Sequence, residues 1–206
     1  MNKITNFIRM PLSDKGTILK SIFYPVLNRY KYGSIGKGSY VNHPIKLVNP
    51  KCIKIGDYSN IGYGARIDCI RRWNDKQYNP SLEIGNGVSI GQNCTISCTD
   101  KIIIGDNVVI SFGSFISDNE HEDLPLGIPL FEKGIRVAHV TIGENTFVGC
   151  NSIVLEGVSV GKNCIIGAGS LIKKDVPDNT MVAGVPAKVI KIYNKKTKKW
   201  DKVSSK

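Results

Sequence analysis

The sequence predicts an all-β solenoid, a parallel β-helix, and three observations lead to that prediction. An aliphatic residue recurs at every sixth position through the stretch 142–172, whereas an amphipathic helix would repeat near 3.6 residues and a half-buried strand would alternate by two. Glycine directly follows four of these aliphatic residues, and a small residue or Val stands four places after five of them. A sustained period of six is typical of a hexapeptide β-helix, in which three repeats close one triangular coil. The repeated aliphatic residues are Ile142, Val148, Val154, Val160, Ile166 and Ile172.

Each part of the repeat has a physical role. The aliphatic side chain is expected to point inward and to stack on its equivalents in coils spaced about 4.8 Å apart. The glycine after it is expected to turn the corner with a positive φ. Cys94 and Cys164 occupy the small-residue position of their repeats, so we expect both to be apolar core fillers.

Residues 1–34 contain no hexad and are predicted to form an N-terminal helical cap. Apolar residues at helical spacing predict a short helix over Lys15–Arg29, capped by Ser13 or Asp14, whose apolar face covers the open first coil. The alternative is a membrane-surface role for this basic, apolar helix, although nothing else in the sequence indicates membrane contact.

The solenoid is predicted to span 35–182. The hexads are interrupted at 71–81 and 117–140, and insertions into such repeats form surface loops that often carry the binding face. The remaining residues, 183–206, are predicted to form a basic tail with a short helix over Ala187–Lys199.

Composition limits the function classes. The chain has 206 residues and a net charge of +11, which suggests anionic partners, but it lacks the aromatic-studded basic motif of a nucleic-acid reader. Its six Cys form no C-x-x-C or zinc pattern, so they are expected to be reduced. With no run of apolar residues long enough for a signal peptide or a membrane span, the expected location is the cytoplasm.

Only three His are present, and one of them is suited to catalysis. His121 begins the second loop amid several carboxylates that are expected to orient its ring, as a general base requires. His43 is interpreted as structural and His139 as a packing or interface residue. The three do not show zinc-ligand spacing, so no metal is expected.

Together, the hexads, the looped His121 and the closing Ala183-Gly-Val-Pro-Ala-Lys188 resemble the hexapeptide-repeat acyltransferases. The resemblance is strongest to the maltose, galactoside and nodulation-type O-acetyltransferases and to the O-antigen and capsule acetyltransferases, and it covers about residues 50–192. It implies a left-handed β-helix, a homotrimer, and acetyl-coenzyme A (acetyl-CoA) bound between adjacent subunits.

The resemblance also implies roles for individual residues. His121 matches the family's catalytic position. Asn93, Asn119 and Phe147 are the substrate-binding candidates; Asn93 stands only near the family's acceptor-holding Asn, and Phe147 replaces its Trp. The implied cofactor-binding residues are Cys150, Ala168, Lys173, Lys174, Lys188 and Lys191.

The function that this resemblance implies is acetyl-CoA-dependent O-acetylation of a sugar hydroxyl, in a surface polysaccharide or its precursor, with direct transfer and His121 as general base. Two enzymatic alternatives are an N-acetyltransferase of a nucleotide-linked amino sugar and a xenobiotic acetyltransferase. From a different class, a non-catalytic trimeric scaffold would share the same repeats.

Overall fold

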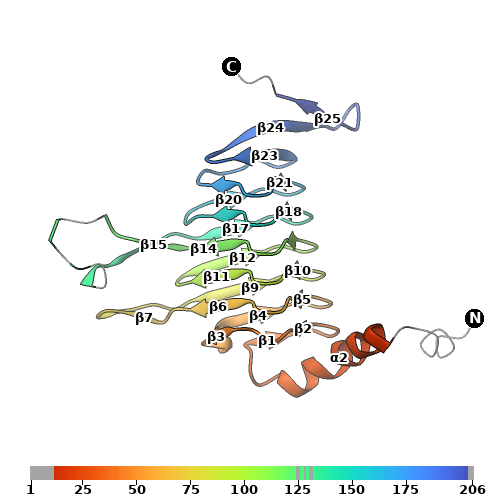
Figure 1. Cartoon of the computed structure of the whole chain (residues 1–206), viewed down its shortest axis with the longest axis vertical. Helices are drawn as coiled ribbons and strands as arrows, with labels where there is room; N and C mark the ends of the chain where they lie inside the picture. The colour runs from red at the N-terminus through yellow and green to blue at the C-terminus, as the bar shows by residue number, and fades with distance from the viewer. Residues whose placement is uncertain (1–11, 124–125, 128, 130–131, 204–206) are drawn as a thin grey trace, which may run out of the picture.

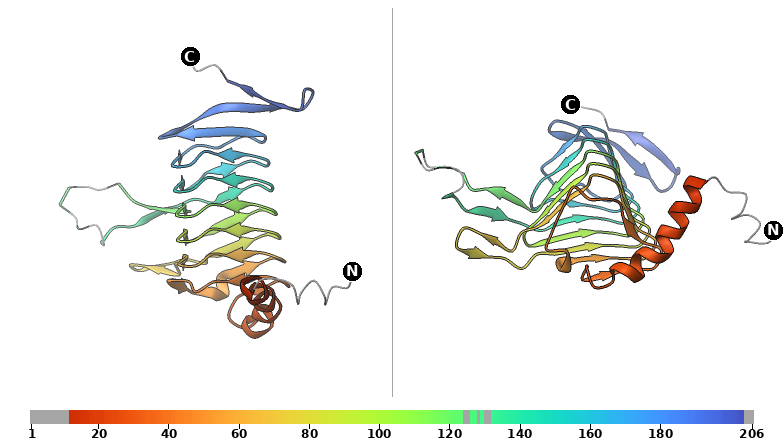
Figure 2. Two further views of the ribbon diagram at one scale, coloured as in Figure 1. Left: turned by 45° about the vertical axis from the view of Figure 1, so that its right-hand side comes forward. Right: turned by 60° about the horizontal axis from the view of Figure 1, so that its bottom comes forward.

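The chain folds into a three-sided parallel β-helix with a helix at its N-terminal end and two antiparallel strands at its C-terminal end (Figure 1). The computed structural model describes residues 12–123, 126, 127, 129 and 132–203. Viewed obliquely from its N-terminal end, the solenoid has the triangular outline that three hexads per coil predict (Figure 2).

Each side of the triangle is one sheet, and all solenoid strands within a sheet run parallel. Face A contains β1 (Ser34–Ile35), β4 (Ile53–Ile55), β9 (Ser81–Ile84), β12 (Lys101–Ile104), β17 (Val140–Ile142) and β20 (Ser159–Val160). Face B contains β2 (Tyr40–Val41), β5 (Asn60–Ile61), β10 (Ser89–Ile90), β13 (Val109–Ile110), β18 (Phe147–Val148), β21 (Ile165–Ile166) and β23 (Thr180–Gly184). Face C contains β3 (Lys46–Val48), β6 (Arg66–Cys69), β11 (Thr95–Cys98), β14 (Phe115–Ser117), β19 (Ile153–Val154) and β22 (Leu171–Ile172).

The core is the set of ladders that the repeated aliphatic residues form, as predicted. On face B, Ile90 lies in register with Ile61 on one side and Ile110 on the other, and all three are 1% exposed. Cys94 and Cys164 are also buried, which confirms their role as small core fillers. Each coil covers the inward-facing aliphatic side chains of the next coil, so the residues that repeat every six positions are also the buried ones.

The prediction that the glycine after each aliphatic residue has a positive φ was wrong. Gly62 follows the aliphatic Ile61, and its φ is not positive; a Cβ there would lie 2.6 Å from the backbone carbon of Gly91 in the next coil. Positive φ occurs two residues later in the corner, at Gly64 and Asn93, for example. The first corner residue therefore has to be small because the coils approach closely, whereas the third is mostly Gly or Asn because its backbone is left-handed.

Both ends differ from the sequence prediction. The N-terminal helix α2 spans Leu12–Asn28, so Ser13 and Asp14 lie within its first turn instead of capping it. The predicted C-terminal helix over Ala187–Lys199 is absent: β24 (Ala187–Asn194) and β25 (Lys199–Lys202) add antiparallel to β23. Edge pairing satisfies the exposed backbone groups of β23, and the β-branched residues of β24 favour an extended strand.

The two predicted loops are β-hairpins that leave the solenoid on the same side (Figure 2). The first pairs β7 (Arg72–Trp73) with β8 (Lys76–Gln77), and the second pairs β15 (Asn119–His121) with β16 (Ile135–Val137). Each follows a face C strand, so both begin at the C–A corner, the edge where face C passes into face A.

Candidate functional site

The second hairpin is anchored where it leaves the coil. Asp118, the residue after β14, is fully buried, and its carboxylate accepts hydrogen bonds from the backbone N–H groups of Thr99 (2.7 Å) and Asp100 (2.8 Å) in the strand-to-corner segment of the preceding coil. The hydroxyl of Ser117 donates to the carbonyl of Asn119 at 2.7 Å. The start of β15, and with it His121, is therefore held in a fixed position.

His121 lies between the two hairpins. Its ring centroid is 5.3 Å from that of Trp73, with the two planes tilted by 58°. Trp73 is itself held by a 2.7 Å hydrogen bond from its Nε1 to the carbonyl of Lys133, which also accepts from Asn74 at 2.9 Å. The two hairpins, some fifty residues apart in the sequence, therefore pack together around this imidazole.

The carboxylates expected to orient the ring of His121 bind elsewhere. Glu122 forms an ion pair with Lys76 at 3.9 Å, and Asp123 forms one with Arg136 at 2.9 Å. Nδ1 of His121 is buried and lacks a hydrogen-bond partner among the described residues. Glu120 accepts a hydrogen bond from the backbone N–H of His121 at 2.9 Å, so it does not hold Nδ1 of the ring, which packs against Trp73.

Asn119 lies two residues before His121 in β15, on the same side of that strand because strand side chains alternate. Its amide donates to the hydroxyl (3.0 Å) and the carbonyl (3.2 Å) of Ser97. Of the predicted substrate-binding residues, Asn119 is the one that the structure places next to His121.

Asn93, Cys150 and Ala168 lie on a different edge, the B–C corner. Cys150 and Ala168 occupy equivalent positions in consecutive coils, and the carbonyl of Cys150 accepts a 2.8 Å hydrogen bond from Gly169. Phe147 points outward from face B with 43% of its surface exposed. Within one chain, none of these four residues joins the His121 cluster.

Three of the four predicted phosphate-binding lysines converge. Lys173, Lys174 and Lys188 line a pocket of about 300 Å³ beside the last parallel coil. Lys173 and Lys174 follow β22 and so lie on the same C–A corner as the hairpin of His121, two coils further along. Lys191 is outside this pocket and pairs in register with Lys202 of β25.

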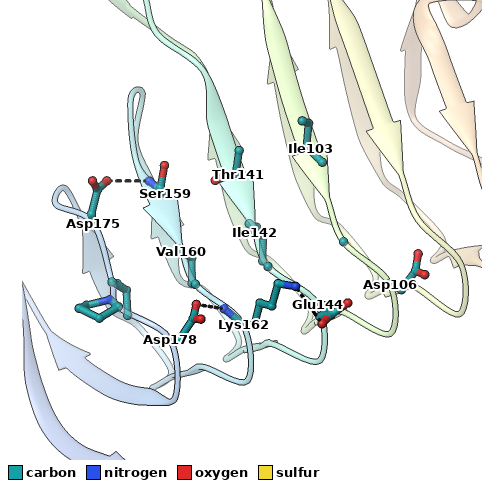
Figure 3. A pocket seen from close by; sticks show the side chains of 15 residues that line it. Ile103, Asp106, Thr141, Ile142, Glu144, Ser159, Val160, Lys162, Asp175 and Asp178 are labelled. Carbon is teal, nitrogen blue, oxygen red and sulfur yellow. Dashed lines mark hydrogen bonds and ion pairs between the residues drawn. The ribbon is translucent and has the colours of Figure 1, made fainter.

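A larger groove of about 540 Å³ runs along face A (Figure 3). Its charged groups are engaged with each other and with the backbone: Lys162 pairs with Glu144 at 3.1 Å, and Asp178 accepts the backbone N–H of Lys162 at 2.8 Å. No predicted site residue lines it, and its four carboxylates already bind backbone N–H groups or Lys162, so we do not assign the reaction to it.

The structure pairs His139 with a carboxylate, which the sequence did not reveal. Its Nδ1 lies 2.5 Å from Oδ2 of Asp100, also at the C–A corner, and 64% of the His139 side chain is exposed. The two residues are 39 positions apart, so only coil stacking shows the contact. An oriented, exposed imidazole is a second candidate base.

Three buried cysteines are poor nucleophiles. Burial raises the pKa of Cys94 and Cys164, and a hydrogen bond with Cys69, together with burial, raises that of Cys98. Over the described residues, no group of three or more His, Cys, Asp or Glu side chains could hold a metal ion. None of the described helices is both long and apolar enough to cross a membrane.

The hexad repeats of this chain match known protein families. Residues 139–174 match the family model "Bacterial transferase hexapeptide (six repeats)", and residues 82–118 match "Hexapeptide repeat of succinyl-transferase". WbbJ of Escherichia coli K12, named as an O-acetyl transferase of lipopolysaccharide biosynthesis, is 30% identical over 79% of this chain and 83% of its own length. Galactoside O-acetyltransferase of the same organism is 35% identical over 59% of each chain.

Among solved structures, the chain is similar to AntD, an N-acyltransferase from Bacillus cereus in complex with dTDP and 3-hydroxybutyryl-CoA. The TM-score is 0.69 at 21% identity, over 84% of this chain and 89% of that one. These matches confirm the predicted left-handed parallel β-helix of hexapeptide repeats.

Proposed function

Since this chain belongs to the hexapeptide-repeat acyltransferases, we propose that it transfers an acetyl group from acetyl-CoA to a sugar hydroxyl of a surface polysaccharide or its precursor. The observation that carries the proposal is the position of His121, a half-buried imidazole held between two hairpins at one edge of the solenoid. The similarity to WbbJ over most of both chains supports the acceptor class.

In the proposed mechanism His121 is the general base. Its Nδ1 is buried, so Nε2 is the nitrogen available to a substrate, and the neutral ring accepts a proton there when Nδ1 carries the hydrogen. The acceptor hydroxyl loses its proton to Nε2 while its oxygen attacks the thioester carbonyl. The carbon–sulfur bond then breaks, and the CoA sulfur leaves as a thiol with the proton from the imidazolium.

The proposed CoA site uses the residues at the C-terminal half of the solenoid. Lys173, Lys174 and Lys188 converge on one pocket, which suits the phosphates of the nucleotide. Cys150 and Ala168 present small side chains along the B–C corner, where a pantetheine arm could lie close to the backbone. Lys191 remains a weaker candidate because it lies outside the pocket.

We also propose a homotrimer, which would bring the separate corners of neighbouring subunits together. Large apolar side chains on either side of the B–C corner stand partly in solvent, including Val109, Phe112, Phe147 and Ile153 at 38–54% exposure. A patch of this kind is typical of a protein–protein contact. A neighbouring subunit could then bring Phe147, Cys150 and Ala168 to His121, which a single chain keeps apart.

The alternative is N-transfer to a nucleotide-linked amino sugar. AntD shows that this fold serves N-acylation, and its structure contains dTDP. All six cysteines are free thiols, which supports a reducing compartment such as the cytoplasm for either reaction.

The test combines a substrate panel with two histidine variants. Mass spectrometry of acetyl-CoA reactions with hydroxyl sugars, polysaccharide fragments and nucleotide-linked amino sugars should show one acetyl added to a hydroxyl. His121→Ala should then lower kcat by about 10²- to 10⁴-fold with CoA binding retained in calorimetry. His139→Ala tests the second candidate base at the same corner and should leave kcat near wild type.

Each other outcome has a distinct meaning. A large loss in His139→Ala with none in His121→Ala would transfer the base role to the pair of His139 and Asp100. Acetylation of an amino group would establish the N-transfer alternative. A wild-type protein that neither reacts nor binds CoA would refute the enzymatic proposal.

A further inference from the structure

The N-terminal helix is placed with its apolar stripe facing outward. Tyr24 and Pro25 face the first coil (β1, β2 and β3); the Tyr24 hydroxyl is hydrogen-bonded to that of Tyr32 at 2.9 Å, and Lys20 binds the side chain of Asn42. The exposed apolar side chains of α2 and of the residues after it form what we call the outer stripe, 47–78% exposed, and two of its members, Ile22 and Val26, also border the groove beside the first coil. The outer stripe consists of Leu19, Ile22, Phe23, Val26, Leu27 and Tyr30.

This orientation reverses the expected cap, in which the apolar face would cover the first coil. The outer stripe follows the i, i+3, i+4, i+7 spacing of one helix face, so it is a continuous surface and not a set of scattered residues. A contiguous exposed apolar surface of this kind is typical of a binding site for another protein, a membrane or a ligand.

The same end of the molecule is strongly basic. Residues 15–56 contain eight Lys or Arg and no Asp or Glu. Three of these lysines form ion pairs with carboxylates of neighbouring coils, Lys37 with Asp57, Lys46 with Asp68 and Lys54 with Glu83. Arg29 and Lys37 line a groove of about 560 Å³ between α2 and the first coil, together with Ile22, Val26 and Tyr58. Apolar side chains from the outer stripe and cationic groups therefore share one surface.

We propose that this end of the solenoid docks on an anionic lipid surface, with the outer stripe of α2 among the lipid headgroups and the basic residues around it. Amphipathic helices bind in this way when one face is apolar and the flanking side chains are Lys or Arg, and each basic residue near the surface strengthens binding about fivefold. A second copy fits this surface less well, since a two-fold contact would set the basic patch against itself.

The test is co-sedimentation of the full chain with vesicles, which needs no substrate and does not depend on the proposed reaction. Vesicles of phosphatidylglycerol mixed with phosphatidylcholine should bind the protein, and vesicles of phosphatidylcholine alone should bind it far less. Binding should weaken as salt is added, because salt screens the attraction.

Two pairs of variants separate the apolar and the cationic contributions. Phe23→Ser with Leu27→Ser should weaken binding about 30-fold or more, whereas Val185→Ser with Ile192→Ser, equally apolar and exposed at the other end, should not. Arg29→Gln with Lys31→Gln should weaken binding about 30-fold, whereas Lys195→Gln with Lys196→Gln should leave it unchanged.

Three results would overturn the proposal. The wild type could fail to bind anionic vesicles at low salt, or the outer-stripe variant could bind as well as the wild type. In the third result, the wild type does not bind vesicles, and the outer-stripe variant dissociates into smaller oligomers in sedimentation velocity. That result would assign the outer stripe to a contact with a second copy of the chain.

Discussion

Asp118 provides a direct test of how the catalytic hairpin is held. Its side chain is inaccessible to solvent and accepts hydrogen bonds from the backbone N–H groups of Thr99 and Asp100 and, at 3.1 Å, from the amide of Asn119. In Asp118→Ala, two backbone N–H groups at the corner lose their acceptor, and Thr99 is fully buried, so water cannot replace it. Each orphaned group costs about 1–3 kcal/mol, so the two together should lower the free energy of unfolding by about 4 kcal/mol.

Asp118→Asn should be intermediate, with a loss of about 2 kcal/mol, because its single carbonyl oxygen can keep one of the two backbone bonds while its amide nitrogen faces the other donor. The control is Asp178→Ala. That carboxylate also accepts a backbone N–H, from Lys162 at 2.8 Å, but the bond is exposed, so the loss should stay below about 1 kcal/mol.

Urea unfolding followed by far-ultraviolet circular dichroism, at one protein concentration, measures all three variants. A loss of about 4 kcal/mol is a large fraction of the free energy of unfolding of a typical domain, which is about 5–15 kcal/mol. If Asp118→Ala unfolds within about 1 kcal/mol of the wild type, the carboxylate does not anchor the hairpin and the reasoning fails.

Two further predictions concern packing and thiol chemistry. Gly62→Ala should destabilise the protein by about 1–3 kcal/mol, because the added Cβ would meet the backbone of Gly91. Gly16→Ala should stabilise it by about 0.5–1 kcal/mol, because Gly16 lies in α2 with open space around it. Equal effects of the two substitutions in thermal unfolding would contradict the packing argument. Iodoacetamide should label half-buried Cys150 before Cys94 and Cys164 in the native protein, because burial raises the pKa of those two thiols and leaves less thiolate at pH 8. Peptide mass spectrometry that finds Cys94 or Cys164 labelled as fast as Cys150 would refute this prediction.

Hexad spacing determined the fold and its core. Ile90 and Cys94 could be placed inside from the sequence alone, because every coil repeats the same local conformation and each repeat therefore faces the same direction. The insertions at 71–81 and 117–140 were recognisable for the same reason, as breaks in that period. His121 stood out by residue type and by its place after a regular coil.

The tertiary structure alone decided which segments meet. Trp73 lies against His121, and Asp100 against His139, because stacking brings together corners of different coils, and no local pattern encodes that distance. It also decided what happens at the ends, where the repeat no longer dictates the conformation. β24 pairs with the open edge of β23 instead of forming a helix, and α2 lies on the first coil with its apolar side outward, an orientation that periodicity cannot determine because a helix wheel shows a stripe but not what it faces.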